Sequence, residues 1–315
     1  MYNFRTDLAD ERRDIFKKAN NIENEIKGIE TEEKQNGDLI KTTKVKIVSQ
    51  EGEEALGKPQ GNYITIDIKK LNIAGENEIE QAAVILSEEL KTLIENNIGK
   101  TDDILVVGLG NIYVTPDALG PKVIADIDIT RHLFHYLPQY VDENTRPVSA
   151  ISPGVLGTTG IETVEILKGI VDNIKPKLVI VIDALASQSV ERISSTIQIA
   201  DTGIVPGAGV GNTRKELSKN TLGVPVIAIG VPTVVEAAVI ANECLNIFIE
   251  KLQNEAQSNE YLNQLKEQNN YEEIKEALLP NDYNFIVTPK EIDELIENMS
   301  SVVARGINKS LNDKF

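Results

Sequence analysis

Between residues 104 and 252, short uninterrupted apolar runs alternate with longer segments of helical periodicity. Strands that are buried on both faces have this continuous apolar character, and they occur in sheets that helices cover on each side. Alternation of such strands with helices is typical of an α/β fold. We therefore predict a mostly parallel central sheet flanked by helices. The predicted strands are 104–109, 148–152, 178–182, 198–200 and 226–229, and the predicted helices are 76–98, 116–134, 161–174, 233–252 and 292–307.

The first hundred residues follow a different pattern. Residues 8–36 are rich in charged side chains with scattered apolar positions, which predicts an exposed helix. Residues 39–48 and 62–68 alternate apolar and polar side chains with a period of two, which is typical of half-buried strands. These two segments predict a β-hairpin or a sheet edge. The N-terminal region is thus expected to be an added hairpin and helix beside the α/β core.

These patterns predict one α/β domain over residues 8–315, with the N-terminal elaboration at 8–100. A segment at about 254–280 is dominated by Gln, Asn and Glu in its first half, and we expect it to be a surface insertion.

The composition excludes several classes of partner. The 49 Asp and Glu residues outnumber the 32 Lys and Arg residues, so the net charge is −17, and binding to duplex DNA or to an anionic membrane would need a cationic face. The one cysteine, Cys244, cannot form an internal disulfide and indicates a reducing compartment. The N-terminus, residues 1–18, has no apolar core of the kind that a secretory signal needs, and no apolar run anywhere is long enough for a membrane span. We therefore expect a cytoplasmic protein with no direct nucleic-acid or membrane partner.

Two aspartates lie where the functional site of an open α/β sheet is expected, beyond the carboxyl ends of the strands. Asp183 directly follows the strand 178–182, and Asp117 follows the strand 104–109 through a short loop. If these strands are neighbours, both carboxyl groups can face one crevice, and one of them then retains a proton. Such a pair can activate water as general base and general acid. The alternative is that Asp117 stabilises a helix start and Asp183 caps a loop.

Neither a cofactor nor a metal is predicted. The glycine-rich segments 108–110 and 207–212 do not match a dinucleotide or phosphate fingerprint. His132 and His135 are three residues apart, which allows two ligands of a metal site in principle. Packing, or a favourable place at the end of a helix, is the preferred interpretation of the two histidines.

Several long segments resemble the germination proteases of spore-forming bacteria, and the resemblance extends over nearly the whole chain. The segments that carry it are 107–121, 130–134, 152–163, 182–187 and 196–212. The resemblance implies an atypical aspartic endopeptidase that starts the degradation of small acid-soluble spore proteins during germination, with Asp117 and Asp183 as the catalytic pair. It also implies an α/β core shared with hydrogenase-maturation endopeptidases, a homotetramer, and a location in the forespore and spore core.

The resemblance further implies a zymogen that cuts itself at a site similar to those in its substrates. Residues 5–11, with the sequence Arg-Thr-Asp-Leu-Ala-Asp-Glu, are similar to such a site. We therefore predict cleavage between Asp7 and Leu8 and a prosegment of residues 1–7. Without the resemblance, the same residues would be interpreted as a frayed terminus that leads into a helix.

Two other functions remain open at this point. The chain could be a nickel-dependent maturation-type endopeptidase of the related fold, in which the two aspartates bind nickel of the substrate. It could also be a non-catalytic acidic binding protein, in which the same aspartates only cap strands.

Overall fold

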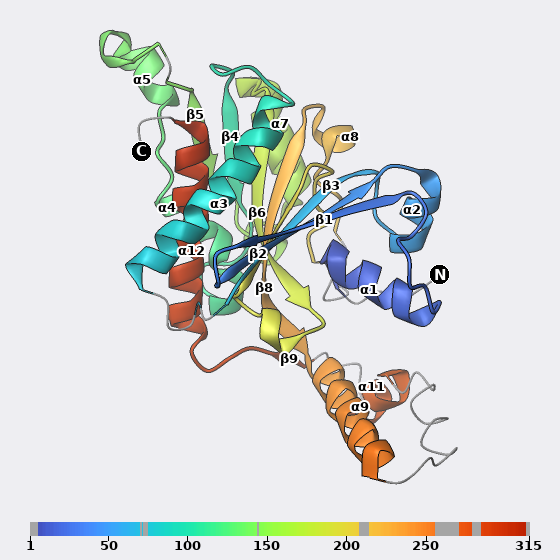
Figure 1. Ribbon diagram of the computed structural model, residues 1–315. Helices are drawn as coiled ribbons and strands as arrows, with labels where there is room; N and C mark the ends of the chain where they lie inside the picture. Colours follow the sequence, from blue (N-terminus) through green and yellow to red (C-terminus); the bar gives the residue numbers. More distant parts are fainter. Residues whose placement is uncertain are drawn as a thin grey trace.

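The computed structural model describes residues 6–69, 71, 75–143, 145–207, 214–255, 271–278 and 285–312. Within these residues, nine strands form one mixed sheet with helices on both faces (Figure 1). The order across the sheet is β1-β2-β3-β7-β8-β6-β4-β5, and β9 pairs with β8 at one end. The predicted α/β fold is confirmed.

One half of the sheet is parallel, as predicted. It consists of β8 (Val226–Glu236), β6 (Leu178–Ser187), β4 (Ile104–Gly108) and β5 (Val148–Ile151). Continuous apolar runs form these strands because both of their faces are covered.

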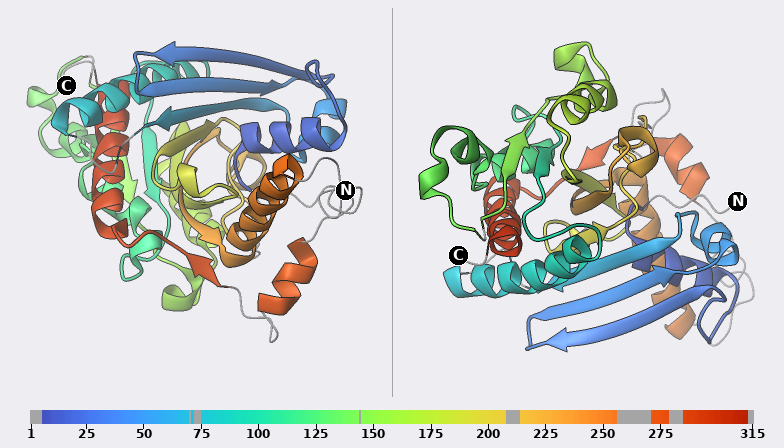
Figure 2. Two further views of the ribbon diagram at one scale, coloured as in Figure 1. Left: turned by 60° about the horizontal axis from the view of Figure 1, so that its bottom comes forward. Right: turned by 90° about the horizontal axis from the view of Figure 1, so that it is seen from above.

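The other half of the sheet is antiparallel, so the sheet as a whole is mixed rather than mostly parallel. It consists of β1 (Ile29–Asn36), β2 (Ile40–Ile47), β3 (Gly61–Ile68) and β7 (Thr196–Ala200). The chain between β6 and β7 is too short for the crossover that a parallel strand needs, so β7 runs antiparallel to β8. Because β3 pairs with β7, the N-terminal strands continue the same sheet (Figure 2).

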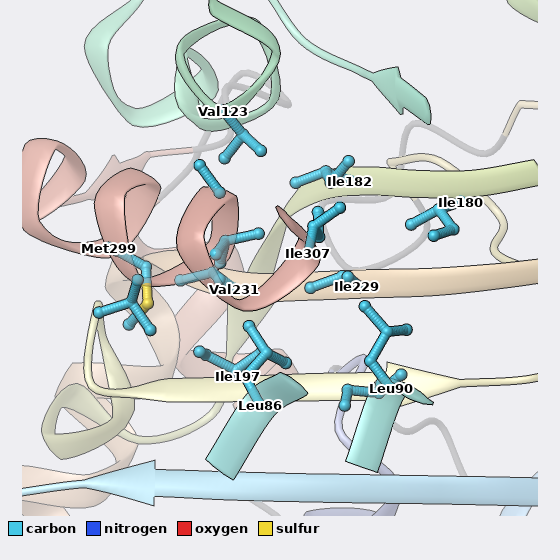
Figure 3. Close-up of a cluster of buried hydrophobic side chains, with 14 of the residues drawn as sticks. Leu86, Leu90, Val123, Ile180, Ile182, Ile197, Ile229, Val231, Met299 and Ile307 are labelled. Carbon is cyan, nitrogen blue, oxygen red and sulfur yellow. The ribbon is translucent and has the colours of Figure 1, made fainter. Parts of the chain in front are cut away.

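Helices cover the two faces of the sheet with separate cores. On one face, α3 (Glu76–Glu95), α4 (Leu119–Ala125) and α12 (Ile292–Leu311) pack on the strands (Figure 3). On the other face, α7 (Thr163–Ile174) and α8 (Lys219–Leu222) cover the parallel strands. There the antiparallel strands are covered by a smaller cluster that includes α1 (Ala9–Ala19) and α2 (Gln50–Leu56).

Two strands are longer than the sequence predicts. β6 continues to Ser187 and β8 to Glu236, because each pairs with the other beyond the end of β4. Asp183 therefore lies inside a strand and not after one. The helix expected from residue 233 begins only at Ala237, as α9 (Ala237–Glu255), and with α11 (Tyr271–Leu278) it projects from the sheet (Figure 1).

Two predicted helices are wrong in extent. The helix expected at 8–36 ends at Ala19, and the strand β1 occupies its second half. The helix expected at 116–134 is divided into η2 (Thr115–Asp117), α4 and α5 (Arg131–Tyr136). Between α4 and α5, Asn308 of α12 donates to the carbonyl oxygen of Asp126 at 2.9 Å and accepts from the amide of Asp128 at 3.0 Å. These tertiary hydrogen bonds replace the intrahelical ones there.

The predicted surface insertion at about 254–280 lies mostly outside the described residues, which leave out 256–270 and 279–284. Within the described part of the chain, no helix is both long and apolar enough to cross a bilayer.

Truncation of Leu86 is expected to lower the free energy of unfolding by about 2–5 kcal/mol. Leu86 of α3 is fully buried between β-strands and α12, so Leu86→Ala leaves a cavity (Figure 3). Val84, two residues earlier on the same helix, is 39% exposed and provides the matched control. Urea unfolding followed by circular dichroism measures both variants. Equal losses for Leu86→Ala and Val84→Ala would contradict the packing described for this core.

Candidate active site at the end of the parallel strands

Asp183 lies in β6 on the face of the sheet that α7 and α8 cover. It is 5% exposed, and its Oδ1 accepts a hydrogen bond of 3.0 Å from the amide of Ala184. In register, Asp183 pairs with Gly230 of β8, and Gly230 pairs with Gln198 of β7. Neighbouring residues in register project to the same face of a sheet. The side chains of Asp183 and Gln198 therefore share one face, separated by a glycine.

Asp117 lies in η2, which follows β4 through the loop that starts at Gly110. The amide of Asn111 donates to the carbonyl oxygen of Asp117 at 3.0 Å and to its Oδ2 at 2.9 Å. Gly110 has a φ of +113°, and a Cβ at this position would lie 2.0 Å from the carbonyl oxygen of Asp117. The glycine thus allows the loop to return closely enough to place Asp117 beside the strand end.

The two predicted aspartates line one cavity of about 440 Å³. Asp7 of the N-terminal segment lines it as well, together with Arg214. Much of the remaining wall is apolar or glycine, and it includes Leu109, Val114, Pro116, Val155, Leu156, Leu185, Val234 and Ile286. A largely apolar cavity with a few convergent polar groups is the usual form of a binding or catalytic site.

The electrostatic environments of the two aspartates differ. Burial raises the pKa of Asp183 well above its usual value, and the nearby charges of Asp117 and Asp7 raise it further. Burial also raises the pKa of Asp117, but the amide of Asn111 and the charge of Arg214 oppose that shift. Asp183 is therefore the more strongly protonated member of the pair, and Asp117 is the member that ionises more easily.

The N-terminal segment passes along the wall of this cavity. Thr6, Leu8 and Ala9 are fully buried, and Asp7 is half-buried. Gln198 holds the main chain on both sides of Leu8: its Nε2 donates to the carbonyl oxygen of Asp7 at 3.0 Å, and its Oε1 accepts from the amide of Ala9 at 2.6 Å. The peptide bond between Asp7 and Leu8 therefore lies against Gln198, and the Asp7 side chain lines the aspartate cavity.

The two histidines singled out in the sequence lie away from the cavity. His132 and His135 are exposed on α5. Among the described residues, no group of three or more His, Cys, Asp and Glu side chains is arranged to hold a metal ion. Of the glycine-rich segment 207–212, only Gly207 is described, and it lines the cavity.

Sequence reasoning missed two residues at this site, Gln198 and Arg214. The local signal for Gln198 is a glutamine between two isoleucines, Ile197 and Ile199, in a short strand, where a buried polar side chain is unusual. Nothing in the sequence around Arg214 connects it with Asp117, because the two residues lie almost 100 positions apart in the chain.

The family profile described as germination protease matches residues 6–266 and 250–315. The germination protease of Clostridium perfringens is 48% identical over 315 residues, covering 99% of this chain and 96% of the relative. The germination protease of Caldanaerobacter subterraneus is 49% identical over 311 residues, covering 98% of this chain and 94% of the relative. The germination protease of Bacillus subtilis is 41% identical over 351 residues, covering 100% of this chain and 95% of the relative.

Among solved structures, a NiFe hydrogenase maturation protease from Thermococcus kodakarensis is 20% identical, covers 44% of this chain and 79% of its own, and has a TM-score of 0.28. This similarity is too low to support an inference about the site. The family profile and the curated relatives, by contrast, extend over nearly the whole chain. The chain therefore belongs to the germination protease family, whose members are peptidases.

Proposed function

We propose that this chain is an endopeptidase that starts the degradation of small acid-soluble spore proteins during germination, and that it is made as a zymogen that cuts itself between Asp7 and Leu8. The observation that carries the proposal is that Asp7, whose carbonyl oxygen accepts a hydrogen bond from Gln198, lines the same cavity as Asp117 and Asp183. The class of substrate rests on the family resemblance. The same resemblance supports a homotetramer in the cytoplasm of the forespore and spore core.

The mechanism we propose is attack of water on the scissile carbonyl carbon, with the two aspartates sharing one proton. Burial raises the pKa of Asp117, but the amide of Asn111 and the charge of Arg214 favour its ionised form, and this form takes a proton from the water. Asp183, whose neutral form is favoured by burial, donates its proton to the carbonyl oxygen. When the C–N bond breaks, Asp117 passes its proton to the leaving nitrogen and Asp183 recovers one from the gem-diol. The pair then returns to its starting state.

Gln198 has a separate role in this mechanism. Its Nε2–H already donates to the carbonyl oxygen of Asp7 in the intact chain. As the carbonyl carbon becomes tetrahedral, negative charge builds up on this oxygen until the proton from Asp183 arrives, and a donor that is already in place stabilises that partial charge. We therefore assign to Gln198 the stabilisation of the oxyanion during self-cleavage.

Self-cleavage is the direct test of the proposed function. Incubation of the purified full chain is expected to shift its intact mass by the loss of residues 1–7, and sequencing of the new terminus should start at Leu8. A parallel incubation with a metal chelator should proceed at the same rate, whereas the nickel-dependent alternative requires inhibition. A chain that stays intact and cuts no peptide would favour the non-catalytic binding protein instead.

A further inference from the structure

We propose that Arg12 is a positioning residue for self-cleavage, which holds the amino side of the Asp7–Leu8 bond in place from the end of α2. Arg12 would act only within its own chain, so it would speed self-cleavage but not the cleavage of separate peptides. This inference rests on the proposed function, since it concerns how the same bond is held at the same cavity.

The side chain of Arg12 connects the N-terminal segment to α2. Its Nε donates to the carbonyl oxygen of Thr6 at 2.9 Å. Its Nη1 donates to the carbonyl oxygens of Leu56 and Gly57, at 3.1 and 3.0 Å. Because a guanidinium group holds its donors in a rigid plane, these acceptors fix its orientation. We call this set of hydrogen bonds the Arg12 clamp, and through it the position of the Thr6 carbonyl depends on the end of α2.

The end of α2 is a firm anchor for a cation. Gly57 ends the helix in the left-handed region, with a φ of +60°. Carbonyl groups in the last turn of a helix have no intrahelical donor and carry partial negative charge, which a nearby cation stabilises. The helix is itself fixed by packing, since Leu56 is fully buried in the cluster that contains Ala9 of α1. The Arg12 clamp therefore ties Thr6 to a packed helix.

The main chain is held on both sides of the bond. On its amino side, Arg12 holds the carbonyl oxygen of Thr6, and Gln198 donates to that of Asp7 at 3.0 Å. On its carboxyl side, the carbonyl oxygen of Leu8 accepts from the amide of Arg12 at 3.2 Å. A chain that is held at successive carbonyl groups has already lost the freedom to turn the bond away from Gln198, which favours reaction there.

Hydrogen bonds are important here because part of the surroundings is empty. Asp7, Arg12 and Gln198 all line a second cavity, of about 150 Å³. Groups beside empty space lack the contacts that close packing supplies. Without the Arg12 clamp, Thr6 and Asp7 could move toward this cavity, and a small displacement of a reacting bond is enough to slow a reaction considerably.

The Arg12 clamp exists only while the bond belongs to the enzyme's own chain. A peptide substrate has to take the place of residues 8–11, so the start of α1 must leave Gln198 before the peptide binds. Arg12 follows directly on these residues and leaves with them. Loss of Arg12 should therefore separate two reactions that use the same pair of aspartates.

Arg12→Gln is expected to slow self-cleavage about tenfold, because a hydrogen bond from a charged donor is lost beside the bond. The time course of the intact mass measures this rate. Wild-type and variant chains that have been incubated until residues 1–7 are released are then compared on a peptide that contains Thr-Asp-Leu-Ala-Asp-Glu, and their kcat/KM should be equal. Arg12→Lys keeps the charge but not the planar fork, so it should also cut itself slowly.

The matched control is Arg13→Gln, on the same helix. Arg13 pairs with Asp14 at 3.0 Å and with Glu33 of β1 at 3.8 Å, so it ties α1 to the sheet without touching the segment before Leu8 among the described contacts. It should keep the wild-type rate of self-cleavage. Equal slowing by Arg13→Gln would show that only the docking of α1 matters, and this would overturn the inference.

Three other results would also overturn it. One is a wild-type rate of self-cleavage in Arg12→Gln. Another is an equal loss of peptide cleavage in this variant, which would indicate general damage. The third is a wild-type rate in Arg12→Lys, which would assign the effect to charge and not to position. If Arg12→Gln does not fold, Arg12→Lys decides.

A measurement without cleavage separates this inference from the proposed function. In the full chain that carries Asp183→Asn, hydrogen exchange followed by mass spectrometry reports the opening of the segment around Leu8 and Ala9. Addition of Arg12→Gln should raise the exchange rate of this segment about tenfold, whereas addition of Arg13→Gln should not. Faster exchange supports the Arg12 clamp even if the wild-type chain never cuts itself, and unchanged exchange overturns it.

Discussion

Replacement of Asp183 by Asn is expected to lower the rate of peptide cleavage by about 10³-fold, because Asn cannot supply the proton that the carbonyl oxygen requires. Self-cleavage at Asp7 should slow to a similar degree. Initial rates on a peptide that contains Thr-Asp-Leu-Ala-Asp-Glu and the intact mass of the incubated chain measure the two effects. Asp172→Asn, which breaks only the exposed pair with Lys168, serves as the control and should keep wild-type rates.

The same variant should not be destabilised at neutral pH. The pKa of Asp183 is raised in the folded chain, so the unfolded chain ionises at lower pH than the folded one. The contribution of Asp183 to the free energy of unfolding is therefore highest below about pH 4, where the carboxyl group is protonated in both the folded and the unfolded chain. This contribution falls as the pH rises toward the pKa of Asp183 in the folded chain. Asn has no such loss.

Thermal unfolding at pH 7 should accordingly give Asp183→Asn a melting temperature at least equal to that of wild type, with the difference vanishing at low pH. An inactive variant that melts lower at pH 7 would indicate lost structure and not lost chemistry. Wild-type turnover by a folded Asp183→Asn variant would reject the two-aspartate mechanism.

Loss of the Gln198 side chain is expected to slow self-cleavage by about 10²-fold, the usual cost of removing one oxyanion donor. Gln198→Leu removes both hydrogen bonds to the N-terminal segment. Gln198→Glu keeps an acceptor for the amide of Ala9 but cannot donate to the carbonyl oxygen of Asp7. If the Nε2–H donor of Gln198 stabilises the oxyanion, both variants should self-cleave slowly. The time course of the intact mass measures the rate of self-cleavage.

The control for these variants is Gln35→Ala, which changes an exposed glutamine that bonds only within its own hairpin among the described contacts. It should process at the wild-type rate. Wild-type processing by Gln198→Glu would show that Gln198 only positions the segment and that the oxyanion is stabilised elsewhere.

The two aspartates could be placed from sequence because their position depends on local pattern. Apolar runs identify β4 and the part of β6 that pairs with it, and the residues that follow these runs lie where β4 ends, although β6 itself continues past Asp183. The structure places Asp117 and Asp183 at one cavity. Their catalytic roles stay a prediction until the variants are measured.

The rest of the site could not be predicted because it depends on strand order. Gln198 reaches Asp7 only because β7 pairs with β8, whose other neighbour is β6. Residues 184–187 continue β6 because they pair with β8, and the polar Asp183 interrupts the apolar run that would otherwise predict this extension. Similarly, the break in the helix predicted at 116–134 depends on two hydrogen bonds with Asn308, to Asp126 and from Asp128, which are 182 and 180 residues away in the chain.

Two long-range contacts also determine when the tertiary structure can form during synthesis. They are the pairing of β3 with β7 and the packing of α3 on α12. Chains leave the ribosome from the N-terminus at about 5–20 residues per second. The residues of β7 and α12 emerge long after those of β3 and α3, so the apolar side of α3 stays without its partner until translation is nearly complete. Leu8 likewise cannot be held by Gln198 before β7 has emerged. The order of synthesis thus keeps the Asp7–Leu8 bond away from Gln198 until β7 has emerged.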